Sequence, residues 1–262
     1  MRIKYFNRYE LKYVIPKAQQ ADIAEDLQYY TQVDGHSHTD GRYLITSLYF
    51  DSPGYKAYHD KIEGHRFRRK VRLRVYGSEP LTPDQPCFAE IKQRANKSLQ
   101  KKRIYIPYQA AEQLCQGDSV ELDFESFTDT DQSTYEEIAY LARTLRLQPA
   151  CIVQYQRAAF NGGDQDPGLR ITFDTNLKCR IHALSLQYNH QAENHYFLPP
   201  DWCVMEVKVN QRVPYWLSEV LGKHRCTLRR VSKYCLALEK ARLNYDQPII
   251  LPDVSKSNEI DR

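Results

Sequence analysis

The sequence lacks the features that mark secreted, membrane-spanning and zinc-binding proteins. Its seven cysteines are an odd number with no Cys-x-x-Cys pair, which argues against a disulfide framework or a zinc site and favours reduced thiols in the cytosol. The N-terminal MRIKYFNRYELKY has no apolar segment of the kind that a signal peptide needs. No apolar run approaches the roughly 20 residues of a membrane span. We therefore expect a cytoplasmic protein with no membrane segment of its own, whose membrane link would run through a partner protein.

Strong net charge, internal repeats and a clear domain boundary are also missing. The formal net charge of the 262 residues is only +4, so the chain is not a uniformly basic coat for nucleic acid. With 42% hydrophobic residues it can bury a core, and its 20 Tyr and nine Phe are typical of a β-rich protein. We expect one domain over residues 1–245 and a disordered tail over residues 246–262.

The basic residues are concentrated in particular segments, most clearly in RRKVRLRVY at residues 68–76. Alternate side chains of a β-strand point to opposite faces. As a strand, this segment has one face of Val and Leu and an opposite face of Lys and Arg alone. The apolar face needs a core and the basic face needs an anion. The basic face comprises Arg68, Lys70, Arg72 and Arg74.

Alternating and amphipathic patterns predict the other elements. Further strands are expected at residues 8–14, 43–51, 88–94, 99–106, 151–160, 169–175, 178–188 and 204–210. Helices are expected at residues 17–30, 55–63, 108–116, 134–147, 214–221 and 232–243. The acidic segment 118–131 is expected to be a solvated loop. In the loop 31–42, His36 and His38 form a lone His-x-His pair, which we interpret as surface and not as a metal site.

Charged residues recur on one face of at least six of these strands. The outer faces of a conventional sandwich would carry Thr, Ser and Gln rather than repeated Arg-x-Arg and Glu-x-Lys. The alternative is an α+β fold, a closed barrel with a polar interior and helices packed on its apolar outside. Arginine and lysine inside it would form a tunnel for a polyanion, and the few carboxylates suit a divalent metal. The charged faces comprise Arg8, Glu10, Lys12, Arg72, Arg74, Glu90, Lys92, Lys101, Arg103, Arg170, Glu206 and Lys208.

At these residues the sequence resembles the polyphosphate-polymerase domain of the vacuolar transporter chaperone (VTC) family, a branch of the triphosphate tunnel metalloenzymes. The similarity runs from about residue 8 to residue 240, and the order and spacing of short motifs carry it. The matching segments are RYELKY (8–13), SLYFDS (47–52), KVRLRVYG (70–77), AEIKQR (89–94), KKR (101–103), YQRAAF (155–160), LRITFDT (169–175), MEVKV (205–209) and RRVSKY (229–234).

The resemblance implies a closed, eight-stranded antiparallel barrel with outer helices and a C-terminal helix. It also implies that ATP donates its terminal phosphate to inorganic polyphosphate, with Mn²⁺ or Mg²⁺ as cofactor. The residues implied in catalysis are Arg72, Arg74, Lys92 and Arg170, which would clamp the nucleotide phosphates, and Glu206. The residues implied in further phosphate binding are Lys12, Lys101, Arg103, Arg157, Lys208, Ser232 and Lys233. Metal binding is expected from Glu206 together with Glu10 or Glu90.

One departure from the superfamily pattern bears on the reaction. The hydrolytic branch carries Glu-x-Glu-x-Lys on its first strand, where this chain has Arg8, Glu10 and Lys12. Losing the first carboxylate favours the polymerase branch. A hydrolase of triphosphate or short polyphosphate, and a non-catalytic module that binds polyphosphate or nucleotide, stay open because they need the same lining. A nucleic-acid-binding barrel is disfavoured, because residues 72–75 offer no aromatic side chain for base stacking.

Overall fold

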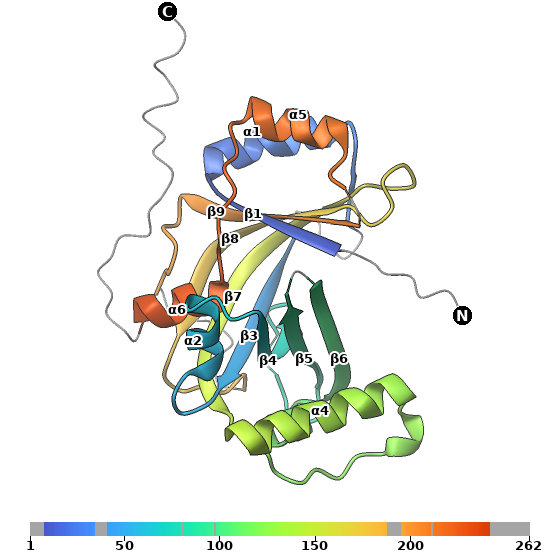
Figure 1. Cartoon of the computed structure of the whole chain (residues 1–262), viewed down its shortest axis with the longest axis vertical. Coiled ribbons are helices and arrows are strands. Elements are labelled where there is room, and N and C mark those ends of the chain that lie inside the picture. The colour runs from blue at the N-terminus through green and yellow to red at the C-terminus, as the bar shows by residue number, and fades with distance from the viewer. Residues whose placement is uncertain are drawn as a thin grey trace, which may run out of the picture.

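A single antiparallel sheet organises the chain, and it curves strongly around a central space (Figure 1). The computed structural model describes residues 8–34, 41–79, 81–96, 98–187, 195–210 and 212–241. Eight long strands follow the order β1-β9-β8-β7-β3-β4-β5-β6, and the short β2 pairs with β7. His36, His38 and the segment 246–262, for which we made predictions, lie outside the described residues.

The elements follow the predicted order closely. The strands are β1 (Arg8–Pro16), β2 (Gln32–Val33), β3 (Arg42–Asp51), β4 (Phe67–Tyr76), β5 (Pro86–Ala95), β6 (Ser98–Pro107), β7 (Gln148–Asn161), β8 (Arg170–Arg180) and β9 (Trp202–Asn210). The helices are α1 (Lys17–Leu27), α2 (Lys56–Ile62), α3 (Tyr108–Gln116), the 3₁₀ turn η1 (Phe124–Ser126), α4 (Asp129–Leu145), α5 (Tyr215–Lys223) and α6 (Lys233–Ala241).

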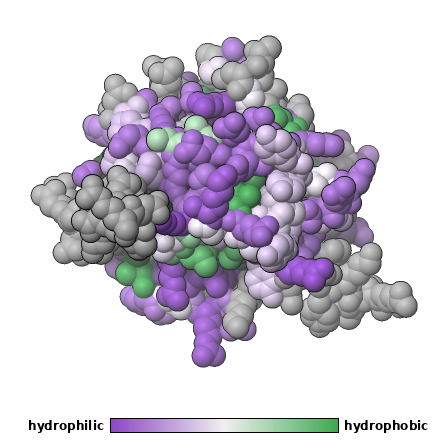
Figure 2. Space-filling view, turned by 90° about the horizontal axis from the view of Figure 1, so that it is seen from above, coloured by the Kyte–Doolittle hydropathy of each residue, from purple (hydrophilic) through white to green (hydrophobic). Residues whose placement is uncertain are grey.

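The alternation of β4 has the predicted consequence. Val71 and Leu73 are buried on the convex side in a core shared with α3 and α4. On another part of the convex side, α1 and α5 pack on β8 and β9 through residues such as Ile23 and Leu217. Burial of apolar area against these helices stabilises the curved sheet and leaves the charged side chains on its concave side. The side of the molecule seen in Figure 2 is mainly hydrophilic, with small separate hydrophobic patches.

Helix α6 packs on the concave side of the sheet, with α2 beside it. Its Tyr234 stacks on Tyr49 of β3 with ring centroids 5.1 Å apart, and Leu238 belongs to the same buried cluster. One end of the concave space is therefore filled by a helix, and the N-terminus of that helix borders the remaining cavity. In the described part of the chain no helix is long and apolar enough to span a bilayer.

Three predicted boundaries were wrong for local reasons. The acidic segment is not a loop throughout, because α4 begins at Asp129, where Thr128 and Asp131 form a reciprocal capping box. The strand expected at 178–188 does not exist as a separate element, since β8 runs continuously to Arg180. Residues 32–33, expected to be loop, pair with β7 as β2.

The predicted closure of the barrel is also wrong. β1 and β6 are the two edges of the sheet and approach each other, yet no backbone ladder joins them in the described residues. The exposed side chains of Lys101, Arg103 and Tyr105 occupy the β6 edge, and charged edge strands typically remain unpaired. The gap is bridged by side chains, since Lys92 on β5 lies 2.9 Å from the Glu10 carboxylate on β1. We call this gap the seam.

Candidate functional site

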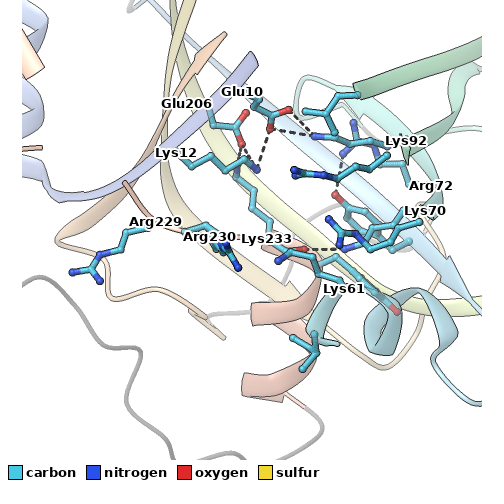
Figure 3. A pocket seen from close by; sticks show the side chains of 18 of the residues that line it. Glu10, Lys12, Lys61, Lys70, Arg72, Lys92, Glu206, Arg229, Arg230 and Lys233 are labelled. Atoms are coloured by element: carbon cyan, nitrogen blue, oxygen red, sulfur yellow. Dashed lines mark hydrogen bonds and ion pairs between the residues drawn. The ribbon is translucent and has the colours of Figure 1, made fainter. Parts of the chain in front are cut away.

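The concave face of the sheet and the N-terminus of α6 enclose a cavity of about 780 Å³ (Figure 3). Six lysines and eight arginines line it, against two glutamates, so its electrostatic character is strongly positive. The lining cations are Lys12, Lys61, Arg66, Arg68, Lys70, Arg72, Arg74, Lys92, Arg94, Arg157, Lys208, Arg229, Arg230 and Lys233, and the glutamates are Glu10 and Glu206.

Arg72 is oriented by the fully buried Glu90 on the neighbouring strand. The register of β4 and β5 places the two residues opposite each other. Arg72 donates from Nε and a terminal nitrogen to one Glu90 oxygen, at 2.8 and 2.6 Å. Burial alone would raise the pKa of Glu90, but the positive charges of Arg72, Arg74 and Lys101 outweigh it and hold that pKa well below its usual value. The pair therefore stays ionised and holds the guanidinium in one orientation.

Arg74 is held by neutral groups and is more available to a ligand. It donates to the Ser47 hydroxyl and to the Tyr155 hydroxyl, each at 3.2 Å. Glu90 lies 4.0 Å away and compensates its charge only weakly. A phosphate oxygen would meet a buried cation whose hydrogen bonds fix its position without neutralising it.

A second charge cluster joins β1 and β9. Lys12 lies 3.1 Å from Glu10 and 3.1 Å from Glu206, because register pairs Lys12 with Glu206. Burial opposes the charge of Lys12, but both carboxylates overcome it and raise its pKa above the usual value. The two glutamates keep depressed pKa values for the reciprocal reason, despite burial. Both carboxylates are thus ionised and close together at the cavity wall.

Lys208 is a lining lysine whose pKa is lowered toward neutral pH by burial. Its ammonium group lies 3.6 Å from Glu206. Burial lowers its pKa to about 7, a fall that the Glu206 charge only partly offsets. Lys208 therefore changes charge close to neutral pH, and a bound polyanion would favour its charged form.

A third cluster links β7 and β8 to α6. Arg157 makes a two-bond contact with Asp174 at 2.6 and 2.7 Å. Lys233 lies 2.6 Å from Asp174 and 2.7 Å from Glu206. These contacts attach the N-terminus of α6 to the sheet and place Lys233 in the cavity (Figure 3).

The remaining lining cations surround the outer part of the cavity and have a different environment. In the described parts of the chain, none of them lies within 4 Å of a carboxylate. Lys70 donates to the Ser232 hydroxyl at 2.9 Å, and none of the group is buried. Their uncompensated charge suits a flexible polyanion that keeps part of its hydration. We call them the rim cations, and they are Lys61, Arg66, Arg68, Lys70, Arg94, Arg229 and Arg230.

Most residues predicted from the sequence meet at this cavity, but three cations do not line it. Lys101 contacts Glu90 at 3.1 Å and supports the Arg72 pair. Arg103 lies over the Phe88 ring, 4.6 Å from its centroid. Arg170 donates to Asp34 and to the Tyr43 hydroxyl.

Sequence reasoning missed the groups that position the cations. Asp174 shares a strand face with Arg170, so its inward direction was visible in the alternation, but its partner Arg157 was not. Tyr49 and Tyr155 carry no charge and gave no signal, although their hydroxyls accept hydrogen bonds from Arg72 and Arg74. The pairings depend on strand register, which alternation within one strand does not specify.

The carboxylates differ in their fitness for a metal ion. In the described residues, no group of three or more His, Cys, Asp or Glu side chains could hold one. Glu90 does not fit, because it is fully buried and does not line the cavity. Glu10 and Glu206 are ionised and line the cavity, and Mg²⁺-type sites often use one or two carboxylates with substrate phosphates and water. Lys12, Lys92 and Lys233 contact these two carboxylates, so a bound metal ion would have to displace them.

The curved antiparallel sheet with a cationic concave face is a fold that this chain shares with a solved structure. A putative adenylyl cyclase from Hippeastrum, described as having a dominant triphosphatase activity, shares the fold with a TM-score of 0.51 and 15% identity, over 87% of this chain and 93% of that chain. The VTC domain family model matches residues 7–242, and the chain belongs to this family.

Two curated relatives support the family assignment. Vacuolar transporter chaperone complex subunit 4 of Trypanosoma brucei brucei is 29% identical over 223 residues, and that of Trypanosoma cruzi is 25% identical over 224 residues. Each alignment covers 72% of this chain but only 27% of the relative. The chain thus spans about a quarter of the length of these relatives.

Proposed function

We propose that this VTC domain is a polyphosphate polymerase, which transfers the γ-phosphoryl group of ATP to the end of an inorganic polyphosphate chain. The observation that carries the proposal is the cavity, where fourteen Lys and Arg side chains face two glutamates. Such an excess of positive charge needs a ligand of high negative charge density. Membership of the VTC family supports polyphosphate and a nucleoside triphosphate as these ligands.

Arg72, Arg74 and Lys92 are assigned to the phosphates of the nucleotide. Phosphoryl transfer depends mainly on positioning and on stabilising negative charge in the transition state. Glu90 orients Arg72, and hydroxyl groups orient Arg74, so neither guanidinium has to reorganise when the reaction occurs. The attacking group is the anionic end of the polyphosphate chain, which needs no protein base because it carries no proton to remove.

The rim cations are assigned to the growing chain. They lie on the same cavity as Arg72 but carry no compensating carboxylates in the described residues. A chain bound there would be held by many weak, exchangeable contacts and would advance as phosphates are added. Arg170, which contacts Asp34 outside the cavity, is not assigned to the central clamp.

A Mn²⁺ or Mg²⁺ ion would be held by Glu10 and Glu206. When bound, such an ion supplies positive charge to the phosphate oxygens. Lys12, which now lies between the two carboxylates, would then turn its ammonium group toward the ligand phosphates. Replacing Glu206 by Gln should weaken the response to metal concentration.

The test is incubation of the purified domain with ATP and Mn²⁺, with detection of long polyphosphate and ADP. Wild type should form chains and Arg72→Ala should form none. Arg69→Ala is the matched control, because Arg69 lies on the same strand but pairs with Glu137 on the outer face, and it should keep full activity. Orthophosphate without chains would favour a triphosphatase, whereas polyphosphate binding without turnover would favour a binding module.

A cytoplasmic, complex-bound setting is part of the proposal. All seven cysteines are free and six of them are buried, which agrees with reduced thiols. The curated relatives are named as subunits of a complex, and a membrane-bound partner would give the product a route across a membrane.

A further inference from the structure

Aromatic side chains form a row across four neighbouring strands at the other end of the concave face, away from the rim cations. Tyr43 of β3 lies 6.0 Å from Tyr76 of β4, Tyr76 lies 5.9 Å from Phe88 of β5, and Phe88 lies 4.7 Å from Tyr105 of β6, measured between ring centroids. We call these four residues the aromatic row. They occupy the same alternating face as Arg72, since Tyr76 follows Arg74 on β4 by two residues.

The row is not part of a closed core. Tyr76 is 46% exposed and Tyr105 is 59% exposed, whereas aromatic side chains inside a domain usually bury most of their area. Tyr43 is buried and anchors the inner end of the row through its contact with Arg170. The exposed rings lie side by side on the concave face, tilted to their neighbours by 46°, 87° and 38°, and offer apolar ring faces and edges to a ligand.

Positive charge accompanies the rings. The Arg103 guanidinium lies 4.6 Å from the centroid of Phe88, which is a cation–π contact. Phe88 is opposite Arg74 in the register of β4 and β5. The row does not line the cavity, but through this register it lies next to Arg74, which is assigned to phosphate in the proposed reaction.

The spacing matches a ligand with a phosphate part and a ring part. Two residues along a strand cover roughly 7 Å, so Tyr76 lies one layer beyond Arg74. A triphosphate held by Arg72 and Arg74 would place whatever follows its α-phosphate above the aromatic row. Polyphosphate itself has no group that gains from aromatic rings, but a nucleoside does.

We propose that the aromatic row stacks the nucleobase of the nucleoside triphosphate. The inference rests on the proposed use of ATP, and it gives the cavity a direction. The nucleotide enters at the aromatic row, its triphosphate lies at Arg72 and Arg74, and the polyphosphate chain occupies the rim cations. Stacking accepts any base because every base has a π face, so the site prefers nucleotides over inorganic triphosphate without selecting adenine strictly.

The experiment compares the dissociation constants of ATP and inorganic tripolyphosphate by calorimetry in the full chain. The two ligands share the triphosphate and differ in the nucleoside. Wild type should bind ATP about tenfold more tightly than it binds tripolyphosphate. This factor is the size expected for one stacked base. Tyr105→Ala should lose this factor for ATP and leave tripolyphosphate binding within twofold, and Tyr76→Ala should act in the same direction.

Matched variants separate stacking from a general effect on the fold. Tyr105→Phe keeps the ring and should keep ATP affinity. Tyr140→Ala, on the outer helix α4 and 60% exposed, should change neither constant. Both Tyr105 variants should show unchanged binding of tripolyphosphate, which serves as the check on folding.

Each contrary result has a defined meaning. Equal affinity of wild type for ATP and tripolyphosphate, or an equal loss of both in Tyr105→Ala, would overturn the inference and leave the polymerase proposal intact. ATP binding that depends on Tyr105, in a protein that makes no polyphosphate, would support the inference and refute the polymerase. Failure of both ligands to bind would refute both.

Discussion

Replacing the buried Glu90 by Gln should destabilise the protein and leave its response to metal unchanged. Glu90 accepts two hydrogen bonds from Arg72 and a contact from Lys101 at 3.1 Å. Removing one partner of a buried ion pair typically costs about 3–5 kcal/mol. Gln retains one acceptor oxygen and Arg72 borders an open cavity, so we expect a cost at or just below the lower end of this range, about 2–3 kcal/mol.

Urea denaturation at pH 7 measures this loss, and the pH dependence tests its origin. The pKa of Glu90 is depressed in the folded protein, so its ionised form stabilises the fold at every pH above the usual value of about 4.5. This contribution declines as the pH falls below 4.5 toward the depressed value. The difference between wild type and Glu90→Gln should therefore narrow on acidification.

A control variant and a metal titration complete the test. Glu137→Gln removes a carboxylate on the outer side of the sheet, where it pairs with Lys102 at 2.7 Å, and should cost less than about 1 kcal/mol. Manganese dependence should be the same in Glu90→Gln as in wild type. Stability within 0.5 kcal/mol of wild type, roughly the additivity error of such measurements, would refute the assigned role, and so would a shifted manganese response.

Other positions give independent predictions. Burial lowers the pKa of Lys208 to about 7, and bound phosphate should raise that pKa. Tripolyphosphate binding should therefore take up a proton at pH 8, and the affinity should weaken from pH 7 to pH 9. Calorimetry in two buffers should show this proton uptake, and Lys208→Arg should abolish it. Gly168 has a φ of +92°, and an added Cβ would overlap the Asn210 amide, so Gly168→Ala should lower the free energy of unfolding by more than about 1 kcal/mol. Tyr234→Phe removes the hydroxyl that donates to the buried Asp51 and should cost about 1–3 kcal/mol in thermal unfolding, with an unchanged melting temperature counting against the contact.

The alternation of side chains correctly predicted which charged residues face the concave side of the sheet. Arg72, Glu90 and Lys92 point to the concave face because each lies on the charged side of a strand whose other side is apolar. This information is local, since a strand with one apolar face can be buried in only one orientation. The predicted side-chain directions therefore hold even where the predicted strand ends are wrong by a few residues.

Register and edge pairing could not be predicted in the same way. Nothing within β8 indicates that Asp174 would be opposite Arg157, because that pairing depends on how two strands align. The aromatic row escaped notice for the same reason: Tyr76, Phe88 and Tyr105 are far apart in the sequence and meet only through the pairing of β4, β5 and β6. Closure was inferred from the charged strand faces and from the resemblance, whereas β6 pairs only with β5 in the described residues and its other edge has no partner strand.

The seam has a topological consequence for any polymer held on the concave face. In a ring of strands closed by backbone hydrogen bonds, a long bound chain leaves only by sliding out through an end. In the part of the chain that the structure describes, the ring is interrupted between β1 and β6, and the Glu10–Lys92 pair spans the interruption. Side-chain ion pairs separate far more readily than a strand ladder, and salt weakens them. A bound polymer of any length would therefore be able to leave sideways through the seam, without sliding along the concave face to its end.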